Sequence, residues 1–145
     1  MNFRSASLLA TLVLVACAAA LLGLHALIPR EPVLVGVQIA AVAVMLWARV
    51  TFGGRSFHAG ANPTEGGLVT TGPYRFVRHP IYLAILLFLW AGAVTHHSIA
   101  SLLVRVVATA ATAVRIVSEE RLVVERYPEY AAYKARTKRI IPFVF

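Results

Sequence analysis

The motif that most clearly suggests chemistry is "RHPIY", residues 78 to 82, directly before a long apolar run. Pro80 suits the first position of a helix, because its missing N–H would have no partner there, and His79 then takes the cap position. The free N–H groups and positive dipole end of such a helix open beside Arg75, Arg78 and His79. We therefore expect a site here for an anionic group, a carboxylate or a phosphate.

A second polar motif, "SEE", follows the next apolar run. Its two carboxylates, Glu119 and Glu120, offer acceptors for a cationic group. Arg115 lies one helical turn before Glu119 and can pair with it. The "SEE" motif therefore supplies negative charge, which the basic "RHPIY" motif lacks.

Antiparallel helices would bring the two motifs together. The apolar runs on either side of His96-His97 predict a helical hairpin. Counting back about 18 residues from its turn reaches His79, and counting forward about 22 reaches Glu119, so their levels differ by about 6 Å. A pocket with anion-binding donors on one side and carboxylates on the other suits a zwitterion, such as the amino-acid end of S-adenosylmethionine.

Membrane helices must position these motifs. Of the 145 residues, 59% are hydrophobic and 14% are charged, and the mean hydropathy is +0.76, which is too apolar for a soluble domain. The net charge of +8 does not indicate nucleic-acid binding, because the cations stand between apolar runs instead of along one face of a soluble fold. We expect an all-α integral membrane protein.

Four apolar runs are long enough to consider as spans, since a helix needs about 20 residues to cross a hydrocarbon layer of about 30 Å. A single membrane domain is predicted, with transmembrane helices at residues 8–28, 33–50, 81–95 and 98–117, the third of them short. Arg and Lys concentrate in the loop 51–79 and the tail 118–145. We therefore expect both termini in the cytoplasm and, in a bacterium, the protein in the inner membrane.

The loop and the tail lie on the same predicted side. The loop is rich in glycine and is predicted to form successive turns. Its last part carries the apolar and aromatic residues Leu68, Val69, Tyr74 and Phe76. These predict an ordered segment packed on the bundle. In the tail, the fourth helix is expected to continue to Tyr127, and Pro128 to open a second short helix.

The sequence "GPYRFVRHPIY", then a pair of apolar runs, then "SEERLVVERYPEYAAYKARTKRIIPF" resembles the isoprenylcysteine carboxyl methyltransferase family and its phospholipid methyltransferase relatives. The resemblance implies a small all-helical membrane methyltransferase that holds S-adenosylmethionine at the cytoplasmic face, in a core of residues 66–143. It implies a lipophilic or lipidated acceptor that enters from the bilayer. The implied cofactor-binding residues are Leu68, Val69, Gly72, Tyr74, Arg78, His79, Tyr82, Glu119 and Glu120.

The sequence leaves the chemical class of the methyl acceptor open. A prenylcysteine-like carboxylate is the first expectation, with Arg126, or else Arg115, to hold it; it is already ionised and needs no base. A phospholipid amine would have to lose a proton, for which Glu120 is the candidate base, and a small thiol is a further alternative. The chain departs from the prenylcysteine enzymes at Tyr127-Pro128, where a glycine-containing turn is expected. A non-catalytic scaffold or lipid-binding protein is the alternative from another class, and the oligomeric state stays open.

The remaining polar residues suggest no separate site. Arg105, within the fourth run, is expected to snorkel to the far surface, which lies about 12 Å away along a helix. The pair His96-His97 is expected in an exposed turn without a metal. Cys17 could end a lipoprotein signal, but the apolar run continues well past it, so an uncleaved span with a small buried cysteine is expected.

Overall fold

Most of the part of the chain that the structure describes is helical. The computed structural model describes residues 2–53 and 67–141, in which one isolated parallel bridge is the only β pairing. The helices are α1 Phe3–Gly23, α2 Pro32–Phe52, the 3₁₀ helix η2 Gly72–Arg75, α3 Pro80–Ala91, the 3₁₀ helix η3 Gly92–Val94, α4 Ile99–Arg126 and α5 Tyr130–Arg136. The predicted all-α fold is confirmed.

Three helices, α1, α2 and α4, are long and apolar enough to cross a membrane, and α3 with η3 forms a shorter apolar helix. Large apolar side chains point outward from them; Leu12 is 67% exposed and Val33 is 79% exposed. Such a surface is stable only when lipid covers it. The protein is therefore an integral membrane protein. Because α4 has 28 residues, it is about 42 Å long and extends past a hydrocarbon layer of about 30 Å.

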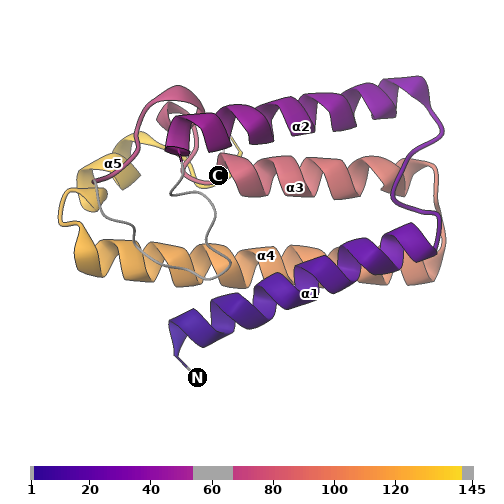
Figure 1. Cartoon of the computed structure of the whole chain (residues 1–145), viewed down its shortest axis with the longest axis horizontal. Helices are drawn as coiled ribbons and strands as arrows, with labels where there is room; N and C mark the ends of the chain where they lie inside the picture. The colour runs from indigo at the N-terminus through magenta and orange to yellow at the C-terminus, as the bar shows by residue number, and fades with distance from the viewer. Residues whose placement is uncertain (1, 54–66, 142–145) are drawn as a thin grey trace.

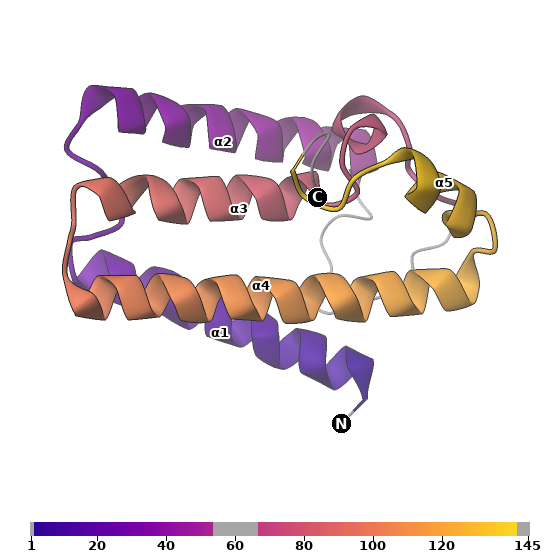
Figure 2. The same ribbon diagram turned by 180° about the vertical axis from the view of Figure 1, so that it is seen from behind.

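The helices pack as two pairs, α1 along α4 and α2 along α3 (Figures 1 and 2). Contacts between α3 and α4, the predicted hairpin, are sparse by comparison. A small apolar core joins the pairs through Cys17 and Leu21 of α1, Leu89 of α3 and Ala108 of α4. Polar contacts at the two ends of the bundle also connect the α1–α4 pair to the α2–α3 pair.

At the end where α3 turns into α4, Arg105 is fully buried. Its guanidinium donates to the carbonyl oxygens of Leu89 at 2.8 Å, Ala26 at 2.6 Å and Ser101 at 3.1 Å. The expected snorkelling is therefore wrong. The carbonyls that follow α1 and end α3 lack helical partners, and a planar guanidinium can bond several of them at once. Gln38 of α2 acts likewise, donating from Nε2 to two further carbonyls of the same segments.

The opposite end, which we call the polar end, is where α2 ends, α3 begins and α4 ends, with η2 and α5 beside them (Figure 1). A parallel bridge joins Val77 to Lys138 there. Much of the predicted loop, residues 54–66, lies outside the described residues. The predicted continuation of α4 is confirmed, since it ends at Arg126. Pro128 was expected to open the last helix, but α5 begins two residues later, at Tyr130.

Candidate functional site

The "RHPIY" motif begins α3 as predicted, with His79 as the cap residue and Pro80 in the first helical position. Its backbone is fixed by the tail. The N–H of Arg78 donates to the carbonyl of Lys138 at 2.8 Å, and the N–H of His79 donates to that of Arg139 at 3.1 Å. These bonds aim the Arg78 and His79 side chains at α4.

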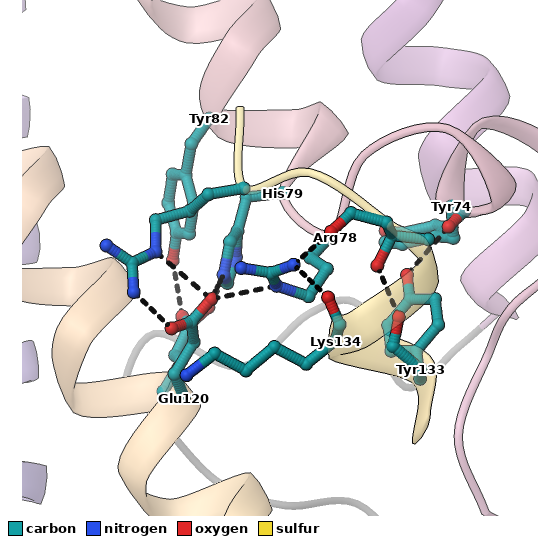
Figure 3. Close-up of polar contacts among 10 residues, drawn as sticks. Tyr74, Arg78, His79, Tyr82, Glu120, Tyr133 and Lys134 are labelled. Atoms are coloured by element: carbon teal, nitrogen blue, oxygen red, sulfur yellow. Dashed lines mark hydrogen bonds and ion pairs between the residues drawn. The ribbon is translucent and has the colours of Figure 1, made fainter. Parts of the chain in front are cut away.

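Glu120 of α4 receives both side chains (Figure 3). Arg78 Nε lies 3.0 Å and His79 Nε2 lies 3.3 Å from Glu120 Oε1, while Arg139 Nη2 lies 2.8 Å from Oε2. The Glu120 side chain is only 8% exposed. These contacts confirm the predicted meeting of the two motifs. The prediction was possible because the fixed rise per residue sets which residues of two antiparallel helices lie at the same level.

Glu120 stands three residues past Val117, beyond the predicted span, and its surroundings keep it charged. Burial alone would raise the pKa of this carboxyl group, but hydrogen bonds from His79, Arg139 and Arg78 outweigh burial and hold the pKa well below its ordinary value. Glu120 is therefore a carboxylate at neutral pH and a weak proton acceptor.

Glu119 forms a second set of contacts, on the side that faces the membrane helices. Tyr82 donates its hydroxyl to Glu119 Oε1, and Arg115 Nη2 reaches the same oxygen at 3.0 Å. Arg115 Nε also lies 2.7 Å from the Tyr82 hydroxyl, and its Nη1 donates to Thr11 of α1. His79 Nδ1 is 3.9 Å from Glu119 Oε2, so the two carboxylates share one network.

Aromatic residues support the network from the side of α5. The hydroxyl of Tyr133 donates to the carbonyl of Tyr74 at 2.7 Å, which fixes α5 against η2 (Figure 3). Burial raises the pKa of Tyr133 to about 12, so its hydroxyl keeps its proton. The Tyr74 ring lies 5.5 Å from that of Phe52, at the end of α2.

The other predicted residues lie around this network. Leu68 and Val69 are half-buried. Gly72 has a φ of +56°, and a Cβ there would come within 2.6 Å of Thr51 Oγ1, so the turn requires glycine. Arg75 points to the surface, with its guanidinium 4.4 Å from the Phe76 ring centre, instead of joining Arg78 and His79. Arg126 is exposed at the end of α4, about 10 Å along the helix from Glu119.

Two members of the network were missed from the sequence. In the sequence, Arg139 is one of several basic residues in the tail, and Thr11 belongs to a run without a motif. The parallel bridge that brings Arg139 to Glu120 leaves no pattern in the sequence. Among the described residues, no group of three His, Cys, Asp or Glu side chains could hold a metal ion.

Comparison with known proteins identifies the family of this chain. A family model described as phospholipid methyltransferase matches residues 32–130. The cobalt-zinc-cadmium resistance protein CzcN of Cupriavidus metallidurans is 36% identical over 114 residues, which are 75% of this chain and 47% of CzcN. The nickel-cobalt-cadmium resistance protein NccN of Alcaligenes xylosoxydans xylosoxydans is 35% identical over 111 residues, again 75% and 47%.

A third relative is named for its reaction. Methanethiol S-methyltransferase 1 of Bradyrhizobium diazoefficiens is 39% identical over 71 residues, 48% of this chain and 24% of the relative. The chain thus spans less than half the length of these curated relatives. No solved structure matches it. Because the family model covers more than half of the chain and includes both polar motifs, this protein belongs to the phospholipid methyltransferase family.

Proposed function

We propose that this protein is an S-adenosylmethionine-dependent methyltransferase that acts on a lipophilic acceptor at the cytoplasmic face of a membrane. The observation that carries the proposal is the convergence of Arg78, His79 and Tyr82 on Glu119 and Glu120 at one end of a membrane bundle. The family and the likeness to a methanethiol S-methyltransferase support methyl transfer as the reaction.

The chemistry of these side chains fits the methyl donor. The amino-acid end of S-adenosylmethionine carries an ammonium and a carboxylate. The network offers carboxylates for the ammonium and cationic donors for the carboxylate, at the same end of the bundle. Glu119, whose side chain is 25% exposed, is accessible to an ammonium. Arg78 and His79 would hold the carboxylate, with Leu68, Val69, Gly72 and Tyr74 as further candidates. When bound, S-adenosylmethionine supplies a methyl group on a positively charged sulfur.

A carboxylate acceptor agrees best with the state of Glu120. Because three basic groups hold Glu120 charged, it is a poor base for removing a proton from an ammonium. A carboxylate needs no such base. Arg115 lies beside Tyr82 and Glu119, close to the membrane-embedded part of α3, where the acid group of a lipophilic substrate would arrive. We therefore place a prenylcysteine-like carboxylate first.

A thiol is the second candidate, because one relative is named for methanethiol methylation. The cysteine thiol has a pKa of about 8.5, and a thiol reacts as its thiolate, so this acceptor also has to lose a proton before methyl transfer. A carboxylate and a thiol differ in the bond formed, ester against thioether. Product analysis therefore separates the two.

Calorimetric binding of S-adenosylhomocysteine to detergent-purified protein tests the proposal. We expect saturable binding that is lost in Glu119→Gln and His79→Ala. Glu129→Gln is the matched control, since Glu129 is exposed and stands outside the network. A folded protein without binding would overturn the proposal. If binding is found, radiolabelled methyl transfer to a prenylcysteine, a phospholipid amine and an alkyl thiol then identifies the acceptor.

A further inference from the structure

A hollow of about 530 Å³ opens beside the last turns of α4, at the polar end. The hollow is more open than enclosed. Of the buried network described above, only Glu120 and Arg139 line this hollow; Tyr82, Arg115 and Glu119 do not. The hollow is thus adjacent to the proposed methyl-donor residues and has its own lining.

The charges of the lining favour an anion. Three cations, Arg121, Lys134 and Arg139, face two carboxylates, Glu120 and Glu125. Glu120 is already bound by Arg139 and by two basic groups behind it, so its charge is more than compensated. Figure 3 shows the Lys134 side chain extending toward Glu120, which adds positive charge at the same place. The excess positive charge of the lining favours an anionic group.

The apolar part of the hollow continues along α4 into the membrane. Val117 lines the hollow, and it also ends an exposed stripe on one face of the helix. The stripe consists of Leu103, Val107, Val114 and Val117, which are 59%, 49%, 45% and 43% exposed. Their spacing of three, four and seven residues keeps them on one side of α4. An acyl chain can follow this stripe over the length of the span.

The position of the hollow along α4 also matches the depth expected for lipid head groups. The hollow extends along α4 from Val117 to Glu125, about 12 Å of helix. Val117 ends the apolar run that crosses the hydrocarbon layer, and the head-group region beyond that layer is about 5–8 Å thick on each side. Phe3 of α1 closes one side, with the Arg121 guanidinium 4.8 Å from its ring centre.

We propose that this hollow binds the phosphate of an anionic phospholipid, whose acyl chains lie along the exposed stripe of α4. Arg121 and Lys134 contact the phosphate, and Val117 and Val124 contact the glycerol and the upper acyl chain. This lipid site is separate from the proposed methyl transfer, although Glu120 and Arg139 belong to both linings. A negatively charged bilayer lipid would hold the end of α4, and with it Glu120, at a fixed depth in the membrane.

Native mass spectrometry of the whole chain in mild detergent tests the proposal, with phosphatidylglycerol as the probe and phosphatidylcholine of the same acyl chains as the neutral comparison. We expect tighter binding of phosphatidylglycerol. Each removed cation should weaken it about fivefold, so Arg121→Gln and Lys134→Gln should each show this loss, whereas Lys134→Arg should retain binding. Arg136→Gln is the matched control, because Arg136 lies on the same short helix as Lys134 but does not line the hollow.

Four results would overturn the proposal. Equal binding of the two lipids would show that the hollow does not select an anionic head group. An equal loss of phosphatidylglycerol affinity in Arg136→Gln would show that the effect depends on overall charge and not on the hollow. Displacement of phosphatidylglycerol by millimolar inorganic phosphate would assign the hollow to a free anion. Displacement by S-adenosylhomocysteine would assign it to the methyl donor, and would leave the proposed function intact.

Discussion

At the scale of single residues, Glu120 is the centre of the polar end, and its removal should cost stability. Glu120→Gln would leave the buried Arg78, whose side chain is 7% exposed, without its carboxylate. Removing one partner of a buried ion pair typically costs about 3–5 kcal/mol, because the other charge stays buried and uncompensated. We therefore expect a clearly lower melting temperature in detergent. The exposed Glu125→Gln should melt like the parent.

Acidification should remove the same stabilisation. The pKa of Glu120 in the folded protein lies below the ordinary value of 4.5, so its contribution is fully present above that value and is lost as the pH falls toward the folded pKa. The melting temperatures of the parent and of Glu120→Gln should therefore converge as the pH is lowered below about 4. A difference that stays constant with pH would show that the carboxylate charge is not the cause.

At the scale of helices, Arg105 and Gly92 hold the end opposite the site. Arg105→Leu would leave the carbonyls of Ala26 and Leu89 without donors, at about 1–3 kcal/mol for each buried unsatisfied group. A Cβ on Gly92 would come within 2.6 Å of the Ala26 oxygen and 2.8 Å of Arg105 Nη2, so Gly92→Ala should disturb the same contacts. We expect both variants to lower the melting temperature in detergent.

Gly36→Ala provides the control for the second variant. A Cβ at Gly36, within α2, meets nothing within 4 Å. Because alanine favours a helix over glycine by about 1 kcal/mol, this change should leave stability equal or slightly higher. Equal losses in Gly36→Ala and Gly92→Ala would contradict the role given to the Arg105 contacts.

The elements also show what the sequence could predict. The meeting of His79 with Glu120 followed from helical rise and hairpin geometry, which are local and regular. The burial of Arg105 did not follow, because helical rise gives only its distance to the surface, whereas the carbonyl of Ala26 that it binds belongs to a segment far away in the sequence. The contact of Thr11 with Arg115 and the bridge that places Arg139 depend on tertiary packing alone.

At the scale of the whole molecule, the proposed function requires the polar end to face the cytoplasm. The basic residues of the tail and of "RHPIY" gather at this end, which is the orientation that the positive-inside rule favours. The chain offers a simple test, since Cys17 is its single cysteine and is 7% exposed. In a Cys17→Ala background, new cysteines can report on each end.

Two exposed positions at opposite ends are suitable, Lys138 beside the site and His97 in the turn before α4. With a maleimide that does not cross membranes, Lys138→Cys should react only in inside-out vesicles and His97→Cys only in right-side-out vesicles. The reverse pattern would place the site outside the cytoplasm, away from the pool in which S-adenosylmethionine is made, and would refute the proposed function even if the isolated protein bound the donor. Labelling of both variants in both preparations would indicate a mixed orientation, which the charge asymmetry between the two ends argues against.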